Sequence, residues 1–176
     1  RADAQSDILD LCAAPGGKTL QLAAGGGRVT ALDASKNRLQ HLTANLARTG
    51  LDAEVLLADL ENWDPPRKFS RVLLDAPCSA TGTIRRHPDL PLHRRRSDIE
   101  KSARHQSTLL ERAADATAPG GTLVYCVCSL EPEEGEGVAR AFLASRDDFS
   151  LMPVGSDEVP ECLSMAATGA GHVRTT

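Results

Sequence analysis

The stretch that decides the fold is Asp10-Leu11-Cys12-Ala13-Ala14-Pro15-Gly16-Gly17-Lys18-Thr19. It follows a short apolar run at residues 8–11 and opens a segment at helical period over residues 18–24, so it predicts a strand, a tight turn and a helix start. Free backbone N–H groups at such a helix start, together with the helix dipole, attract an anionic group. The stretch therefore predicts an α/β unit that holds a nucleotide or a carboxylate in its turn.

Two known nucleotide-binding motifs are close to this turn without matching it. A P-loop also ends in Gly-Lys-Thr, but it needs a glycine five residues before the second glycine, where this chain has Cys12. A dinucleotide fingerprint needs Gly-x-Gly-x-x-Gly, whereas the turn offers only Gly16 and Gly17. A P-loop phosphotransferase and a dinucleotide-binding protein are therefore disfavoured.

Outward from this stretch, short apolar runs alternate with segments at helical period. The predicted strands are residues 8–11, 29–33, 54–57, 71–75, 123–126 and 149–153. The predicted helices are residues 18–24, a helix capped by Ser35 that ends before Gly50, a helix from Ser97 to the break at Pro119-Gly120-Gly121, and Glu131 to Arg146. This alternation is typical of βαβ units, so the predicted fold class is α/β, with a mostly parallel, doubly wound sheet and helices on both faces.

Composition excludes several other classes of protein. The chain has 176 residues, 41% hydrophobic and 25% charged, which fits one soluble domain over residues 1–176 and no membrane span. A net charge of -4 argues against binding nucleic acid through bulk positive charge, and 3% aromatic residues argue against a stacking platform. Because the chain opens at Arg1 without an initiator methionine, we expect a piece of a longer protein.

The cysteines point to a reducing compartment. The chain has five, and none forms a Cys-x-x-Cys pair, so a disulfide scaffold and a zinc site are disfavoured. They are Cys12, Cys78, Cys126, Cys128 and Cys162. We expect a cytoplasmic monomer without a metal, in which a cysteine is a small buried residue unless its surroundings indicate otherwise.

Three aspartates follow consecutive predicted strands. Asp33 ends the second strand, Asp59 follows the third and Asp75 ends the fourth. Each alone is more often a turn former, but the carboxyl ends of parallel strands meet at one edge of the sheet, where such folds hold a ribose and an adenine. The three acids therefore predict a cofactor that carries a nucleoside.

Three motifs together carry a family resemblance. They are Asp10–Thr19, Asp75-Ala76-Pro77-Cys78-Ser79-Ala80-Thr81-Gly82 and Tyr125-Cys126-Val127-Cys128-Ser129. In this order they resemble the S-adenosylmethionine-dependent RNA cytosine-5 methyltransferases, closest to the bacterial branch that acts on small-subunit ribosomal RNA. The resemblance spans residues 8–149 and implies a Rossmann-like class I methyltransferase fold. It also implies an N-terminal RNA-binding domain and closing C-terminal strands, which we expect to lie outside this chain.

The resemblance also implies a cofactor site. S-adenosylmethionine would lie among Cys12, Ala13, Ala14, Pro15, Gly16, Gly17, Lys18, Asp33, Asp59 and Asp75. Lys18 would orient Asp75 or the cofactor carboxylate, and a solvated helix start is the alternative for it.

The chemistry needs a thiolate, because C5 of cytosine is a poor nucleophile until a group adds to C6. The family assigns this attack to the cysteine that matches Cys128, assigns release of the product to Cys78, and leaves Asp75 to bind the cytosine edge. By analogy with DNA cytosine-5 methyltransferases, Pro77-Cys78 would carry the nucleophile instead, and residue chemistry alone does not choose. Cys126 replaces a small polar residue of the family pattern, and we expect a structural role for it.

A local run of cations follows the Cys78 loop in this acidic chain. It consists of Arg85, Arg86, Arg94, Arg95, Arg96, Lys101 and Arg104. Contact with RNA phosphates is the favoured interpretation, and a solvated helix face is the alternative. The expected substrate is small-subunit ribosomal RNA, and the alternatives are transfer RNA or a non-catalytic methyltransferase-like module that binds RNA during assembly.

Overall fold

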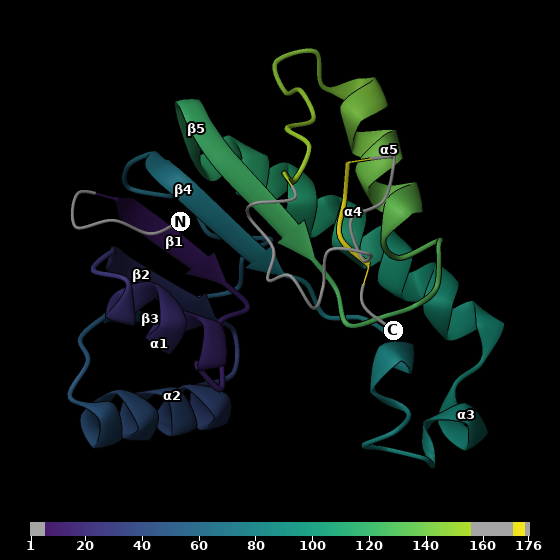
Figure 1. The fold of residues 1–176 in the computed structure, drawn as a ribbon, viewed down its shortest axis with the longest axis horizontal. Helices are drawn as coiled ribbons and strands as arrows, with labels where there is room; N and C mark the ends of the chain where they lie inside the picture. The colour runs from purple at the N-terminus through teal and green to yellow at the C-terminus, as the bar shows by residue number, and fades with distance from the viewer. Residues whose placement is uncertain (1–5, 156–170, 175–176) are drawn as a thin grey trace.

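The computed structural model describes residues 6–155 and 171–174, so Cys162 lies outside the described residues. Five strands, paired in parallel throughout, form one sheet in the order β3-β2-β1-β4-β5, with helices on both faces (Figure 1). The strands are β1 (Asp7–Leu11), β2 (Arg28–Asp33), β3 (Glu54–Leu57), β4 (Phe69–Asp75) and β5 (Thr117–Cys126). The helices are α1 (Gly17–Ala24), α2 (Lys36–Thr49), the 3₁₀ turn η1 (Thr81–Thr83), α3 (Leu90–His93), α4 (Arg96–Ala116) and α5 (Glu136–Ser145). The doubly wound α/β fold is confirmed.

Two apolar cores lie on opposite faces of the sheet. Leu9 and Leu11 alternate along β1 toward the core that they share with α4 and α5. Ala31 of β2 belongs to the other core, which it shares with the apolar face of α2. Accordingly, α4 and α5 cover one face and α1 and α2 the other (Figure 1).

The caps predicted for α2 are confirmed. The Ser35 side chain accepts a hydrogen bond from the Arg38 N–H at 3.3 Å, and Gly50 has the left-handed φ of 67° that favours glycine at a helix end. Gly16, in the turn before α1, also needs to be glycine. Its φ is 104°, and a Cβ there would lie 2.9 Å from Cγ of Leu42 in α2. The turn that decides the fold is thus packed directly on the second helix.

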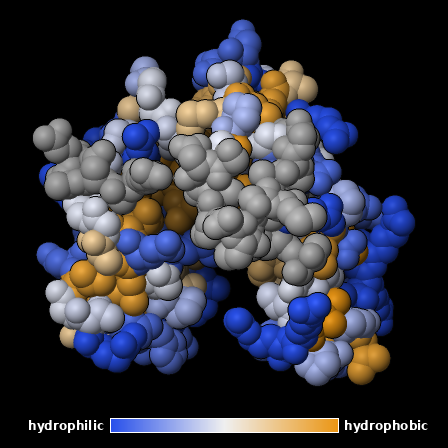
Figure 2. Space-filling view, viewed as in Figure 1, coloured by the Kyte–Doolittle hydropathy of each residue, from blue (hydrophilic) through white to orange (hydrophobic). Residues whose placement is uncertain are grey.

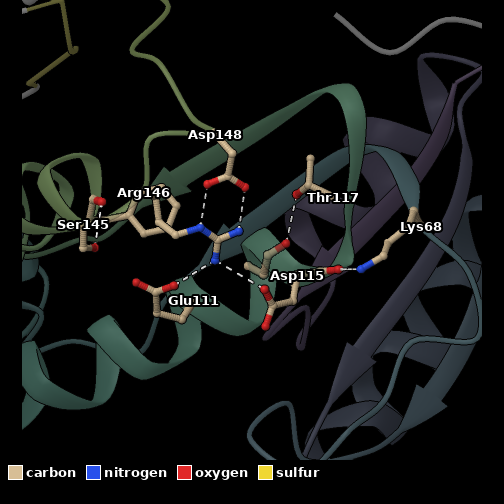
Figure 3. Close-up of polar contacts among 9 residues, drawn as sticks. Lys68, Glu111, Asp115, Thr117, Ser145, Arg146 and Asp148 are labelled. Carbon is tan, nitrogen blue, oxygen red and sulfur yellow. Dashed lines mark hydrogen bonds and ion pairs between the residues drawn. The ribbon is translucent and has the colours of Figure 1, made fainter.

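The strand predicted at residues 149–153 is wrong, because the described chain is irregular there. Phe149 turns inward and packs edge-on against Phe142, with ring centroids 5.3 Å apart. The Arg146 guanidinium lies 5.3 Å from the centroid of the Phe149 ring. Ion pairs hold that guanidinium in place (Figure 3), and its partners are Glu111, Asp115 and Asp148.

Other boundaries also differ from the prediction. The last helix begins at Glu136 rather than Glu131, because residues 132–135 form a turn that directs the Glu134 side chain into the protein. The helix predicted from Ser97 ends at Ala116, and β5 already begins at Thr117, with a register shift against β4. The short elements η1 and α3 were not predicted. Within the described residues, no helix is long and apolar enough to cross a membrane.

Candidate active site

The strand order places a crevice at the carboxyl ends of β1 and β4. From β1 the chain winds outward through β2 to β3, then crosses back to β4 on the other side of β1. In open sheets of this kind, ligands bind where the winding changes direction. At this edge the surface is notched between the half that carries α1 and α2 and the segment that carries α3 (Figure 2).

The loop from Cys12 to Lys18 follows the carboxyl end of β1, at this edge of the sheet. Its first turn is held by two backbone hydrogen bonds, from the Ala13 N–H to Leu32 O at 3.0 Å and from the Gly16 N–H to Ala13 O at 2.9 Å. Ala13, Ala14 and Gly16 are buried, whereas Pro15, Gly17 and Lys18 are exposed. No side chain caps α1, so the N–H groups of its first turn are available to a ligand. A Cβ on Gly17 would meet nothing within 4 Å, which leaves open space beside this turn.

A buried carboxyl group lies behind the loop. Asp10 is 0% exposed, and its Oδ2 accepts a hydrogen bond from Thr19 Oγ1 at 2.6 Å. Its other oxygen, Oδ1, is buried without a hydrogen-bond partner among the described residues. Burial, against the lowering effect of the Thr19 hydrogen bond, raises the pKa of Asp10 to about 6. This orphaned acceptor indicates that the site provides for a donor from a ligand or water.

Asp33 and Asp59 are placed differently. Asp33 is 2% exposed and accepts hydrogen bonds from the Ala14 N–H at 3.1 Å, from the Ser35 N–H at 2.8 Å and from the Arg38 guanidinium. It is therefore joined directly to the loop from Cys12 to Lys18. Asp59 is exposed and accepts hydrogen bonds from neighbours in sequence, the Glu61 N–H and the Asn62 side chain.

Asp75 lies at the centre of the predicted site. Lys18 Nζ donates to its Oδ2 at 2.6 Å, and the Cys126 thiol donates to its Oδ1 at 3.4 Å. Partial burial lowers the pKa of Lys18, but the hydrogen bond and charge of Asp75 outweigh this and raise it. The end of β4 thus connects the loop from Cys12 to Lys18 with the end of β5, and the role of Lys18 toward a cofactor stays a prediction.

The two candidate catalytic cysteines face each other. The Sγ atoms of Cys78 and Cys128 lie 3.3 Å apart, although the residues are 50 positions apart in the chain. A hydrogen bond from the Cys78 thiol lowers the pKa of Cys128, with a further contribution from the Lys18 charge. The same bond, together with burial, raises the pKa of Cys78.

The remaining described cysteines have the opposite electrostatics. Burial and the charge of Asp33 raise the pKa of Cys12 to about 12, and burial and the charge of Asp75 raise the pKa of Cys126 to about 12. Since only a thiolate is a strong nucleophile, the facing pair Cys78 and Cys128, rather than Cys12 or Cys126, is the place in the described part of the chain where these surroundings favour a thiolate.

The sequence missed the groups that hold the two cysteine loops together. The carboxylate of Glu134, 0% exposed, contacts the serine that follows each cysteine, Ser79 and Ser129. Glu134 lies in an acidic run that gives no sign of an inward residue. Gln106 also binds this carboxylate, and it could have been found, because it occupies a position on the buried face of α4.

Some side chains of the cationic run bind other groups of the protein, and others do not. Arg94 Nε donates to Ser79 O at 3.0 Å and so holds the Cys78 loop in place. The Arg96 guanidinium lies 3.8 Å from the carboxylates of Glu100 and Glu133. Arg85 and Arg86 are exposed, and no ion pair involves them in residues 6–155 or 171–174. These two side chains are therefore available to a phosphate, as are the exposed Lys101 and Arg104, which also form no ion pair within the described residues.

Comparisons with known proteins agree with this arrangement. A family model described as 16S rRNA methyltransferase RsmB/F matches residues 2–172. Ribosomal RNA small subunit methyltransferase B of Sodalis glossinidius is 44% identical over 171 residues, which cover 93% of this chain and 40% of that protein. The protein of the same name from Klebsiella pneumoniae is 46% identical over 158 residues, which cover 87% of this chain and 37% of that protein. The chain thus spans about 40% of the length of these curated relatives.

Solved structures match at somewhat lower identity. NSun6 from Pyrococcus horikoshii, crystallised with the S-adenosylmethionine analogue SFG, is 33% identical with a TM-score of 0.76 over 86% of this chain and 42% of that protein. A methyltransferase homologue from the same organism is 37% identical with a TM-score of 0.75 over 87% of this chain and 49% of that protein.

Proposed function

Because the chain belongs to the RsmB/F family of 16S rRNA methyltransferases, we propose that it transfers a methyl group from S-adenosylmethionine to C5 of a cytosine in small-subunit ribosomal RNA. The observation that carries this proposal is the pair of facing thiols, Cys78 and Cys128, beside the Lys18–Asp75 ion pair at the carboxyl edge of the sheet. The test is to incubate the full-length protein with methyl-labelled cofactor and 16S RNA and to digest the RNA to nucleosides. Label in 5-methylcytidine supports the proposal, and label confined to another nucleoside contradicts it.

The residues of the crevice fit S-adenosylmethionine. The uncapped N–H groups of α1 suit its carboxylate, the unpartnered Oδ1 of Asp10 suits a donor such as its ammonium group, and Asp33 suits the ribose hydroxyls. When bound, the cofactor supplies an electrophilic methyl group. Asp59, exposed beyond β3, is proposed to contact the adenine.

The first prediction concerns the cofactor. Asp33→Ala should weaken S-adenosylmethionine binding roughly 10-fold to 100-fold, because a carboxylate that accepts from ribose hydroxyls contributes about 1.5–3 kcal/mol. Titration calorimetry measures the affinity, and thermal unfolding shows whether the variant is folded. Asp52→Ala, at an exposed acid, is the matched control. Unchanged affinity in folded Asp33→Ala would remove Asp33 from the site.

Cys128 is proposed to attack C6 of the target cytosine as a thiolate. The new S–C6 bond pushes electron density onto C5, which then accepts the methyl group. We propose that Cys78 is the donor in the hydrogen bond between the two thiols, which holds Cys128 in the reactive form before attack. Because attack is on the face of the ring, the base must leave its stack to reach this edge of the sheet.

Asp75 and Lys18 are proposed to orient the ring. The Asp75 carboxylate would accept a hydrogen bond from the N4 amino group of the cytosine and, as N3 takes up a proton from solvent during attack, from the N3–H of the adduct, while Lys18 and the Cys126 thiol hold that carboxylate in place. The raised pKa of Cys126 suits this role, because it keeps the thiol protonated and only a protonated thiol can donate a hydrogen bond to Asp75.

Cys78 is proposed to act at release. After methyl transfer, a base removes the C5 proton, the electrons of the C5–H bond re-form the C5–C6 double bond, and Cys128 leaves as a thiolate. Cys78 is within contact of the leaving sulfur and can protonate or reorient it. The two cysteines therefore have separate roles in one cycle.

The second prediction concerns RNA. The double variant Arg85→Glu/Arg86→Glu should weaken RNA binding about 10-fold or more. It should also make binding less dependent on salt, because a protein that contacts fewer phosphates releases fewer counterions when it binds. Cofactor affinity should not change. The control is Arg28→Glu/Arg71→Glu, which reverses two exposed charges near the amino ends of β2 and β4, the opposite ends of these strands from the proposed site. Filter binding across a salt series measures both, and an unaltered salt slope would mean that the run is a solvated surface.

A further inference from the structure

A buried carboxylate joins the two cysteine loops. Glu134 is 0% exposed and lies in the turn between β5 and α5. Its Oε1 accepts from the Ser79 N–H at 2.8 Å and from Gln106 Nε2 at 3.1 Å. Its Oε2 accepts from Ser129 Oγ at 2.5 Å and from Ser79 Oγ. One side chain therefore binds the residue that follows Cys78 and the residue that follows Cys128.

The groups around Glu134 extend this connection. Gln106 Nε2 also donates to Pro77 O at 2.9 Å, on the other side of Cys78. The Tyr125 hydroxyl donates to the backbone oxygen of Glu134 at 2.5 Å. The backbones of the two cysteine loops also contact each other directly. The Gly82 N–H donates to Cys128 O at 3.0 Å, and a Cβ on Gly82 would lie 2.8 Å from that oxygen. Both loops are thus fixed close to the reacting sulfurs.

Stability alone does not account for a carboxylate at this place. Burying an ionisable group costs free energy that hydrogen bonds recover only when all of them are well placed, and an apolar side chain of similar size is often as stable. Four donors from three elements converge on Glu134, and two of the residues involved are adjacent to the cysteines. The arrangement indicates that this group fixes geometry.

We propose that Glu134 is a positioning residue that holds Cys78 and Cys128 within reach of each other. The expected effect of Glu134 on methylation rests on the proposed function, whereas its effect on the spacing of the two thiols does not. Glu134 acts through hydrogen-bond geometry, since its carboxylate contacts the serines beside the cysteines and not the sulfurs. The largest influences on the pKa of each thiol are the hydrogen bond between the two thiols and burial. A loss of this residue separates the thiols without inactivating either.

Two conservative variants separate length from charge. Glu134→Gln keeps the length, and its amide oxygen can take the place of Oε1 while its NH₂ donates to the two serine hydroxyls, which are able to accept. Glu134→Asp keeps the charge but is one methylene shorter and cannot reach both loops. Geometric positioning therefore predicts that Gln is tolerated and Asp is not, and an electrostatic role predicts the reverse.

The experiment measures the spacing of the thiols directly. Dibromobimane bridges two nearby thiols as each sulfur displaces a bromide, and the bridge is identified by mass spectrometry as a link between tryptic peptides 72–85 and 113–140. In the full-length protein, bridging should be at least about 10-fold slower in Glu134→Ala and Glu134→Asp than in wild type, and within about 3-fold of wild type in Glu134→Gln. Alkylation of Cys128 by iodoacetamide should continue in all of them. Glu133→Gln, at the exposed neighbour, is the matched control.

Activity supplies the second measurement. A misplacement of about 1 Å can cost roughly 100-fold in rate, so Glu134→Asp should lower kcat by about that factor with little change in KM for RNA. If Glu134→Ala does not fold, the comparison of Glu134→Gln with Glu134→Asp still distinguishes geometric positioning from an electrostatic role. Bridging in Glu134→Asp at the wild-type rate, or in Glu134→Gln no faster than in Glu134→Asp, overturns the proposal. Because bridging needs no RNA or cofactor, a wild-type protein that bridges but does not methylate would contradict the proposed function and leave the positioning role standing.

Discussion

Replacing Cys128 by alanine is expected to lower RNA methylation at least about 10⁴-fold, the largest effect of any single change in the site. Without a thiolate at this position nothing adds to C6, and C5 of the cytosine stays unreactive toward the methyl group. RNA and cofactor should still bind, because Cys128 is exposed at the rim of the crevice and fills no part of the core. Single-turnover transfer of labelled methyl groups measures the loss.

Serine is the informative control for this prediction. Cys128→Ser keeps the shape of the side chain but replaces an activated thiol with a hydroxyl that is a far weaker nucleophile, so it should be nearly as inactive as alanine. Thermal unfolding and cofactor affinity of both variants should match the wild type. A Cys128→Ala protein that methylates within 10-fold of the wild-type rate would assign the attack to another group.

Replacing Cys78 by alanine should have a different consequence, which is the accumulation of a covalent RNA–protein complex. Cys128 can still attack C6 and the methyl group can still be transferred, but release stalls when the neighbouring thiol is missing. Most of the protein in a reaction with excess RNA should migrate as a complex that survives denaturation. A denaturing gel with labelled RNA reads this directly.

The double variant provides the control for trapping. Cys78→Ala/Cys128→Ala should give no covalent complex, because the trapped species requires attack by Cys128. The assignment used by DNA cytosine-5 methyltransferases predicts the reverse, with the complex in Cys128→Ala. Methylation at near-normal rates in both single variants would make the two cysteines structural.

The sheet and its functional edge were predictable from local patterns. Strands β2 and β4 are short apolar runs that end in an acid, and Asp33 and Asp75 lie at the strand ends where that pattern predicted them. Helix α2 was predictable because its caps, Ser35 and Gly50, are specified by single residues. The segment from Phe149 was not, because an alternating apolar pattern does not distinguish a strand from a loop whose aromatic ring packs under Arg146.

The site was predictable where a motif names the residue and unpredictable where packing decides. The cysteines and Asp75 come from motifs, and the structure brings Cys78 and Cys128 together. The inward turn of Glu134 depends on donors from α4 and from the Cys78 loop, which are distant in sequence. For Asp59, its local hydrogen bonds fit a turn former as well as a ligand contact, so its cofactor role stays a prediction.

The identity of the nucleophile is tested most directly by mapping the cysteine that carries the substrate. RNA with 5-fluorocytidine at the target position lets attack and methyl transfer proceed, but a fluorine at C5 cannot leave as a proton does, so the adduct with the wild-type full-length protein persists. Digestion with trypsin and nuclease yields two candidate peptides, residues 72–85 with Cys78 and residues 113–140 with Cys126 and Cys128. We predict that fragmentation mass spectrometry finds the methylated fluorocytidine on Cys128 of the second peptide. The same nucleotide on Cys78 would contradict the account.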